Sequence, residues 1–194
     1  MNNKDLINHI EESISLKKKI PALSKEISKS IDQIYKVLKN KSKIFICGNG
    51  GSAADAQHIA AEFMVRLRPN VNRDPYPVIS LALDTSTITA CGNDYSFDEL
   101  FARNLKGLAK KGDLLIAIST SGNSRNILKV LKEARKLNIK SIALLGNSGG
   151  KAKRLSDLNI TVPSKTTARI QEIHIFLAHY IALKVEKKLL RNMS

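Results

Sequence analysis

The apolar residues of this chain follow two patterns: stripes spaced as on one face of a helix, and short continuous runs. Apolar residues three or four positions apart mark two N-terminal segments and a C-terminal segment from about 168 to 190. The stripes consist of Leu6, Ile10 and Ile14, then Leu23, Ile27, Ile31, Ile34 and Leu38, and finally Ile170, Ile173, Leu177, Ile181, Val185 and Leu189. Pro21 separates the first two stripes. The pattern therefore predicts two amphipathic helices before residue 42 and one long helix near the end.

Between these helices, short β-rich runs alternate with further helical patterns. The runs cover residues 43–47, 77–82, 113–118, 141–145 and 159–162. Because they are apolar throughout, they suit a parallel sheet that helices cover on both faces. The expected fold class is therefore α/β, a three-layer αβα sandwich of the flavodoxin or Rossmann-like kind.

The chain shows no sign of division into separate domains. Its 194 residues, 43% of them apolar, fit one domain with a well-buried core, and no repeat, linker or break in composition interrupts it. We expect a single domain over residues 1–194, with 1–41 as a helical appendage on an α/β core of 42–194. The appended and terminal helices carry more apolar stripe than one sheet needs, which favours self-association over packing within the chain.

Composition sets the expected location and excludes some chemistry. No run approaches the roughly 20 apolar residues that span a bilayer, and the first thirty residues are charged and amphipathic rather than signal-like. We therefore expect a cytoplasmic protein with no membrane partner. Cys47 and Cys91 are too few for a disulfide framework and lie in no metal-binding spacing, so both are interpreted as buried thiols.

The net charge of +15 raises the question of nucleic-acid binding. The basic residues are spread over predicted helix faces, with no aromatic residues interleaved among them, and the chain has only 4 Tyr and 5 Phe. This distribution favours a solvated basic surface that attracts anionic ligands over a dedicated nucleic-acid site.

The first predicted strand leads into a glycine-rich turn, GNGGS at 48–52, and then a helix. Ligands of open parallel sheets bind beyond the carboxyl ends of the strands, and bare backbone amides at a helix N-terminus suit an anion or sugar hydroxyls. A tight structural turn is the alternative. Gly48, Gly50 and Ala53 match GxGxxA, but no acidic residue ends a following strand and no GxxxxGK[ST] occurs, which disfavours a nucleotide.

The third predicted strand ends in a hydroxyl-rich loop, ISTSGNS at 118–124, ahead of a helix over about 125–137. Four hydroxyls, a glycine and a helix N-terminus form a neutral cradle for a phosphate. Ser124 taken alone also suits a helix N-cap. Four hydroxyls in six residues exceed the needs of capping, so the loop is predicted to bind phosphate.

Two helices carry candidate acid/base or metal-binding residues. His58 and Glu62 lie four residues apart and share a helix face, where they suit a metal pair, an acid/base pair or a surface hydrogen bond. Gln171 and His179 on the last helix are about 80° apart in rotation and about 12 Å apart in rise, so one metal reaches both only through strongly converging side chains. A single histidine on such a helix is more commonly a packed or capping residue.

Five motifs occur in one order over nearly the whole chain: GNGGS, DAQHIAAE, CGNDYSFDELF, ISTSGNS and RIQEIHIFLAH. Together they resemble the phosphoheptose isomerases, or sedoheptulose 7-phosphate isomerases, of the sugar-isomerase (SIS) domain superfamily. The resemblance implies five parallel strands, a homotetramer and conversion of D-sedoheptulose 7-phosphate to D-glycero-D-manno-heptose 7-phosphate. It also implies that the product feeds nucleotide-activated heptose for lipopolysaccharide or capsule.

The resemblance further implies a role for individual residues. The substrate-binding set is Asn49, Gly50, Gly51, Glu62, Asn93, Asp94, Ser119, Thr120, Ser121, Ser124 and Gln171. Glu62 and His179 are the implied catalytic residues, and one zinc ion per subunit is implied at His58, Glu62, Gln171 and His179. An aldose–ketose shift through an enediol needs a carboxylate base and a partner that serves the oxygens, which agrees with this assignment. A zinc ion would polarise the carbonyl.

Two other readings share part of this pattern. A non-catalytic SIS adaptor that binds the replication initiator has GNGGS, the serine-rich loop and RIQE, but lacks the carboxylate and histidine found here as Glu62 and His179. These two residues favour an enzyme. A phosphosugar-binding regulator would carry a DNA-binding domain, for which the first forty residues are too short and too evenly charged.

Overall fold

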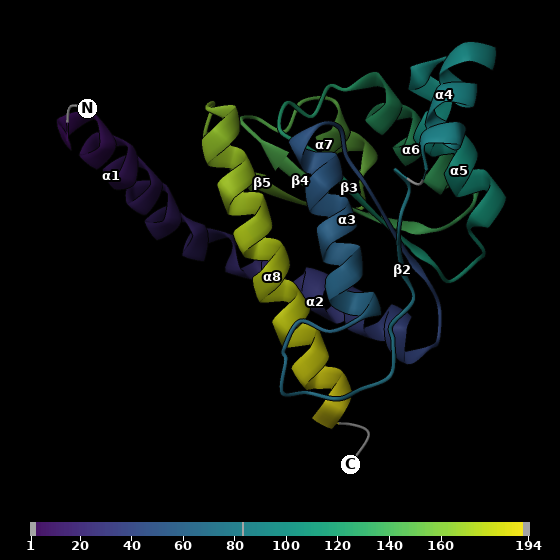
Figure 1. Cartoon of the computed structure of the whole chain (residues 1–194), viewed down its shortest axis with the longest axis horizontal. Coiled ribbons are helices and arrows are strands. Elements are labelled where there is room, and N and C mark those ends of the chain that lie inside the picture. Colours follow the sequence, from purple (N-terminus) through teal and green to yellow (C-terminus); the bar gives the residue numbers. More distant parts are fainter. Residues whose placement is uncertain (1–2, 83, 192–194) are drawn as a thin grey trace.

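A computed structural model describes residues 3–82 and 84–191 and shows one sheet between two layers of helices (Figure 1). The strands are β1 (Ile44–Cys47), β2 (Val78–Ser80), β3 (Leu114–Ser119), β4 (Lys140–Gly146) and β5 (Leu158–Val162). They are all parallel, in the order β2-β1-β3-β4-β5. Every residue of β1 and β3 is buried, as expected for strands that helices cover on both sides. The five predicted strands and their parallel arrangement are confirmed.

The helices divide between the two faces of the sheet. They are α1 (Asn3–Lys19), α2 (Ser24–Lys39), α3 (Gly51–Met64), α4 (Thr85–Asp94), α5 (Leu100–Leu108), α6 (Arg125–Lys136), α7 (Ala152–Leu155) and α8 (Thr167–Arg191), with short 3-10 turns η1 (Ile20–Leu23) and η2 (Phe97–Glu99). Ile44 and Ile46 pack in one apolar cluster with α2, α3 and α8. Phe45 and Cys47 point to the other face and pack with residues of α4 to α7. The three-layer sandwich is therefore confirmed.

The two N-terminal helices differ in how they pack. Pro21 lies in η1, between α1 and α2 as predicted, and α2 buries Ile27 and Ile34 within the first helical layer. By contrast, α1 projects from the body of the molecule (Figure 1), and its stripe residues Leu6, Ile10 and Ile14 are about half exposed. The apolar face of α1 is thus available for a further contact.

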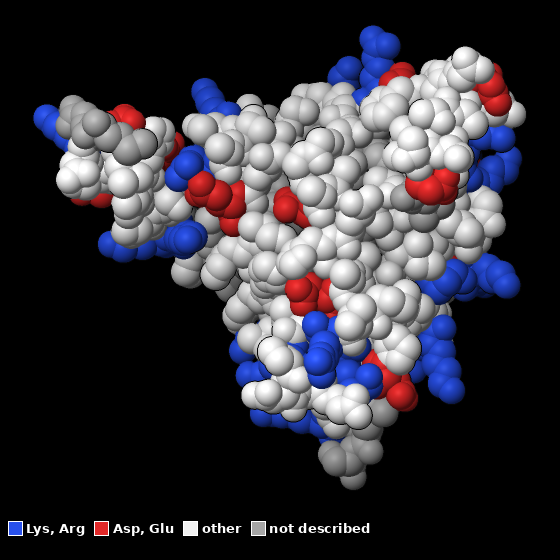
Figure 2. Space-filling model, in the orientation of Figure 1, with Lys and Arg blue, Asp and Glu red and all other residues white. Residues whose placement is uncertain are grey.

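The structure bears on two expectations that were drawn from the composition. Both cysteines are free and buried, and burial raises the pKa of the Cys47 thiol, so the interpretation as buried thiols is confirmed. Within residues 3–82 and 84–191, no helix combines the length and apolar character needed to cross a membrane. On the face that Figure 2 shows, many basic side chains lie around the edges, a further group lies in the lower middle over the C-terminal half of α8, and a few acidic side chains lie in the middle.

Candidate active site

The glycine-rich turn between β1 and α3 has a backbone that only glycine accommodates well. Gly50 has a φ of +55° and ψ of −123° at the N-cap of α3, a conformation that residues with a Cβ rarely adopt. A Cβ on Gly51 would lie 2.7 Å from Nε2 of Gln171. The first turn of α8 therefore places the Gln171 amide directly against this loop, and the structure brings together two elements of the predicted substrate site.

Asn49, also in this turn, is tied to the start of α6. Its Nδ2 donates to Oδ1 of Asn126 at 2.9 Å, and Nδ2 of Asn126 donates back to Oδ1 of Asn49 at 2.8 Å. Asn126 is 2% exposed, and the backbone N–H of Ile127 also donates to its Oδ1. Sequence reasoning missed Asn126; the available signal was an amide beside the apolar stripe of the predicted helix. The pair fixes the glycine-rich turn to the serine-rich loop.

The serine-rich loop after β3 presents hydroxyls at the N-terminus of α6. Oγ of Ser119 accepts the backbone N–H of Gly122 at 3.1 Å and lies 3.4 Å from Oγ of Ser124. Ser124 occupies the N-cap position but makes no side-chain capping hydrogen bond. Its hydroxyl therefore faces Ser119 rather than an N–H group of α6, which weakens the interpretation of Ser124 as a cap and supports a ligand-binding role. Ser121 is more exposed, and its Oγ accepts the N–H of Asn123 at 3.1 Å.

The loop between β4 and α7 holds the serine-rich loop from behind. The backbone N–H of Ala152 donates to the carbonyl of Gly122 at 2.9 Å. Gly122 has a φ of +65°, and a Cβ there would lie 2.0 Å from the carbonyl oxygen of Gly149. The hydroxyl groups are thus presented by a loop whose conformation is fixed before any ligand binds.

His58 and Glu62 on α3 meet His179 on α8. Nε2 of His58 lies 2.8 Å from Nε2 of His179 and 3.4 Å from Oε1 of Glu62, and the two rings stand edge to face at 87°. Side-chain exposure is 49% for His58 and 17% for Glu62, so the cluster is reachable from solvent. The structure therefore brings together three of the residues for which a catalytic or metal-binding role was predicted.

The three side chains fit a divalent metal. Their potential ligand atoms all lie within 4.8 Å of one another. Ligand atoms about 2.0–2.1 Å from a tetrahedral zinc are about 3.3 Å apart, close to the observed His58–Glu62 separation. The two imidazoles, 2.8 Å apart, need to separate by only about 0.5 Å to share a metal.

Gln171 lies apart from this cluster in the described chain. Its amide is at Gly51, and His58 is two helical turns further along α3, about 10 Å away. This separation agrees with the rise of about 12 Å between Gln171 and His179 on α8. Of the four residues implied as zinc ligands, His58, Glu62 and His179 converge, the amide of Gln171 lies at the glycine-rich turn, and its role as a ligand stays a prediction.

Asp55 lies one turn before His58 on α3 and was not identified from the sequence, although its spacing of three residues from His58 places both on one helix face. Partial burial raises the pKa of Asp55, and the neighbouring His58 and His179 oppose that shift only in part. Asp55 is therefore a further carboxyl group in the electrostatic environment of the cluster.

Asn93 and Asp94 end α4 and are both exposed. Nδ2 of Asn93 donates to Oδ1 of Asp94 at 2.9 Å. The structure thus joins this predicted substrate-binding pair to each other at a helix terminus, where both side chains are accessible.

His174, one turn after Gln171, has a structural position. It is 1% exposed, and its Nε2 lies 3.0 Å from the carbonyl oxygen of Leu145 at the end of β4. Burial lowers the pKa of His174 to about 4, so the ring is neutral at neutral pH and Nε2 carries the donated proton. For His174, the expectation that a single histidine on this helix is packed is confirmed.

Comparisons with known proteins agree with this geometry. Residues 8–146 match the SIS domain family model. The chain is similar to the phosphoheptose isomerase of Aliarcobacter butzleri, with 47% identity over 186 residues that cover 96% of each protein. It is 53% identical over 150 residues to that of a Nitratiruptor species, covering 77% of this chain and 79% of the relative. A solved phosphoheptose isomerase from Francisella tularensis superposes with a TM-score of 0.90 at 36% identity, covering 96% of this chain and all of that one. With its parallel sheet, its two loops and its relatives in agreement, the chain belongs to the phosphoheptose isomerases of the SIS domain family.

Proposed function

We propose that this enzyme converts D-sedoheptulose 7-phosphate to D-glycero-D-manno-heptose 7-phosphate. One observation carries the proposal: a carboxylate, Glu62, lies in a solvent-accessible cluster with two imidazoles, on the helix that starts at the glycine-rich turn. The serine-rich loop, which the Asn49–Asn126 pair links to the glycine-rich turn, offers hydroxyls and a helix N-terminus to the phosphate. Membership of the phosphoheptose isomerases supports the seven-carbon sugar phosphate as substrate.

The reaction requires a base at carbon and a proton carrier at oxygen. In the proposed mechanism Glu62 removes a proton from C1 of the ketose, which gives an enediol, and returns a proton to C2. His179 moves the hydroxyl proton from O1 to O2, so the aldehyde forms at C1 and protons balance. The half-buried amides of Asn49 and Gln171 and the exposed side chains of Asn93 and Asp94 are assigned to the sugar hydroxyls. The hydroxyl residues Ser119, Thr120, Ser121 and Ser124 and the backbone amides of Gly50 and Gly51 are assigned to the anionic end.

We propose that one zinc ion per subunit binds His58, Glu62 and His179. Two histidines and one glutamate, with a coordination position left for substrate or water, form a donor set that catalytic zinc sites use. When bound, zinc polarises the substrate carbonyl. The amide of Gln171 lies at Gly51, so we assign Gln171 to the substrate, and its role as a fourth zinc ligand stays a prediction of the family resemblance.

A homotetramer is part of the same proposal. Beside the exposed stripe of α1, an apolar groove of about 840 Å³ runs between η1, α2 and α8 and includes Phe176 and Tyr180, both more than 40% exposed. The groove therefore runs along α8, the helix that also carries His179. Replacing Ile10 and Ile14 together by Lys should lower the mass measured by light scattering; an unchanged mass would exclude α1 from the interface.

The wider role follows from the substrate. We propose that the enzyme acts in the cytoplasm, in agreement with its two free cysteines, and supplies nucleotide-activated heptose for lipopolysaccharide or capsule. The direct test is to incubate the purified protein with sedoheptulose 7-phosphate and follow the anomeric signals by NMR. New aldose signals are expected. Persistence of the ketose alone, with zinc supplied, would refute the proposed reaction.

A further inference from the structure

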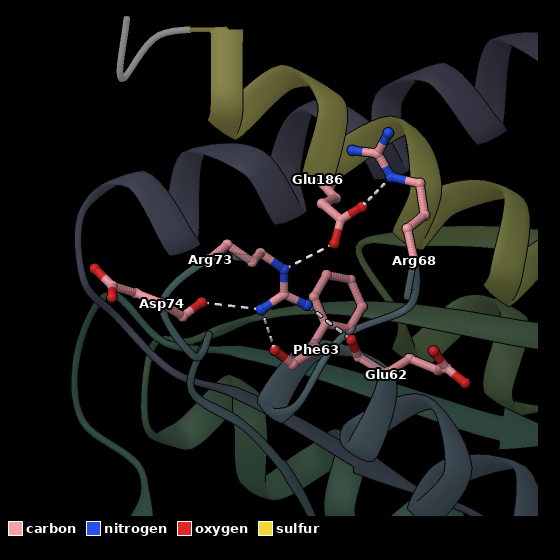
Figure 3. A network of polar contacts seen from close by, with 6 residues as sticks. All are labelled: Glu62, Phe63, Arg68, Arg73, Asp74 and Glu186. Carbon is pink, nitrogen blue, oxygen red and sulfur yellow. Dashed lines mark hydrogen bonds and ion pairs between the residues drawn. The ribbon is translucent and has the colours of Figure 1, made fainter. Parts of the chain in front are cut away.

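A buried arginine in the segment between α3 and β2 joins the two helices that carry the catalytic cluster (Figure 3). The side chain of Arg73 is 3% exposed, and its Nε donates to Oε1 of Glu186 on α8 at 2.7 Å. Its Nη2 donates to the carbonyl of Glu62 at 2.8 Å, and Nη1 donates to the carbonyls of Phe63 and Asp74, each at 2.9 Å. One planar guanidinium therefore makes four hydrogen bonds to fixed positions in three segments.

At the α3 end, Arg73 serves as a C-terminal cap. The carbonyls of Glu62 and Phe63 lie in the last turn of α3, where carbonyl groups have no partner within the helix. A cation is also favourable at this negative end of the helix dipole. The ring of Tyr76, 4.4 Å from the guanidinium carbon, stacks on Arg73 and restricts its orientation.

At the α8 end, the carboxylate of Glu186 is held from two sides. It is 2% exposed, and its second oxygen accepts Nε of Arg68 at 2.6 Å. Glu186 follows His179 by two helical turns and so lies on nearly the same face of α8, about 10 Å further along. Figure 3 shows Glu186 on α8 and Glu62 at the end of α3 on opposite sides of Arg73.

We infer that Arg73 is a positioning residue that sets the register of α3 against α8 through Glu186, and thereby the arrangement of His58, Glu62 and His179. This inference rests on the proposed function. Apart from the His58–His179 contact and the Gln171 amide at Gly51, the two helices meet in an apolar cluster, and apolar contact has no preferred direction. A planar guanidinium bonded to both helices does have one, and a shift of 1 Å would disturb imidazoles that lie only 2.8 Å apart.

The clamp should affect turnover and metal binding rather than substrate affinity. It lies at the C-terminal end of α3, whereas the glycine-rich and serine-rich loops lie at the other end and are held by Asn126 and by the loop before α7. Losing the clamp should therefore lower kcat and zinc affinity while KM stays nearly constant. A general loss of folding would instead affect kcat, zinc affinity and KM together.

The test uses two variants and one control of the full chain. Arg73→Lys keeps the charge but replaces the planar set of donors with a single ammonium group. The double variant Arg73→Met with Glu186→Met removes the buried pair and leaves no unpaired charge in the interior, because Arg68, the other partner of Glu186, is 33% exposed to solvent. Such a replacement is often neutral for stability. The control is Asp113→Asn, just before β3, because Asp113 is buried and accepts the backbone N–H groups of Lys43 and Lys110, which belong to neither α3 nor α8.

For each protein, kcat and KM are measured, together with thermal unfolding and the affinity of the metal-free form for Zn²⁺ in competition with a chromophoric chelator. The expected result is a 10- to 100-fold loss of both kcat and Zn²⁺ affinity in both Arg73 variants, with KM within about 3-fold of wild type. Asp113→Asn should lower the unfolding temperature without either loss.

The inference is overturned if both Arg73 variants keep kcat and Zn²⁺ affinity within about 2-fold, or if Asp113→Asn loses them equally. Failure of the proposed function is a different result: the wild-type protein would then leave sedoheptulose 7-phosphate unchanged. In that case the Zn²⁺ affinities still decide whether Arg73 positions the cluster.

Discussion

The two loops lie at the N-terminal end of α3 and the His58–Glu62–His179 cluster lies further along it, and the two regions are built differently. The loops directly follow β1 and β3, and hydrogen bonds within and between them, such as those of Asn49 with Asn126, fix their shape. The cluster is made of side chains from α3 and α8, and its closest contact joins residues 121 positions apart in the chain. Its geometry therefore depends on how two whole helices pack.

This difference separates the effects that substitutions should have. In the proposed roles, a change in the loops removes one group that contacts the substrate, and the scaffold stays in place. A change in the cluster then removes a group proposed to act on the reacting carbons or to hold the metal. Loop variants should act mainly on KM, and cluster variants mainly on kcat.

The largest effect is expected for Glu62→Gln, which keeps the shape and most hydrogen bonding but removes the base. We expect kcat to fall by about 10²- to 10⁴-fold, with KM changed only slightly. Steady-state kinetics with sedoheptulose 7-phosphate measures both. Zinc content must be determined in the same sample, because a weaker metal ligand would also lower kcat. A higher KM with an unchanged kcat would place Glu62 in substrate binding rather than in catalysis.

Removal of zinc should have the next largest effect. Protein purified without chelator should contain about one zinc per subunit, and EDTA should lower kcat by at least about 10-fold, with recovery when zinc is returned. Elemental analysis and activity of the same preparation provide the measurement. Full activity after complete chelation would mean that the cluster works by acid/base chemistry alone.

A smaller effect, on KM, is expected in the serine-rich loop. Ser119→Ala removes a hydroxyl that is buried beside Ser124, and each lost bond to a charged phosphate costs roughly 1.5–3 kcal/mol, or about 10- to 150-fold in KM. Ser121→Ala should raise KM less, since Ser121 is more exposed and its Oγ already accepts an N–H. Unchanged kinetics in the double variant would rule out phosphate binding by this loop.

The smallest effect concerns stability and His174. Because burial lowers the folded-state pKa of His174 from its ordinary value of 6.5 to about 4, the unfolded chain binds more protons than the folded one between these values. Stability should therefore decrease as the pH falls from about 6.5 to 4, by up to about 1.4 kcal/mol per pH unit from this group.

His174→Gln can still donate to the carbonyl of Leu145 but cannot titrate, so it should remove this part of the pH dependence. His9→Gln, on the exposed α1, is the control and should leave the slope unchanged. Denaturant unfolding at several pH values measures both. Equal slopes in wild type and His174→Gln would show that the buried ring does not contribute.

The sequence predicted those features that depend on neighbouring residues. Continuous apolar runs located all five strands, because both faces of the sheet are covered, and loop composition identified the two turns that meet beside Asn49. Features that depend on tertiary packing were missed. Arg73 and Glu186 are 113 residues apart and belong to no motif, and the packing of α2 into the first layer has no local signature.

The roles of the site residues remain predictions of the family resemblance, and the structure supports some of these roles more directly than others. His58, Glu62 and His179 were separate candidates in the sequence, and helix packing brings them within 4.8 Å. Gln171 was implied both as a ligand of zinc and of the substrate, and its place at Gly51 favours the substrate.

The central claim, that Glu62 transfers a proton between carbons, is tested most directly by isomerisation in D₂O. Sedoheptulose 7-phosphate is incubated with wild-type enzyme and with Glu62→Gln containing the same amount of zinc, and the products are followed by NMR. An enediol mechanism with an exchanging base predicts deuterium at C2 of the aldose for wild type and neither label nor product for the variant. Wild-type turnover and labelling in Glu62→Gln would show that another group is the base.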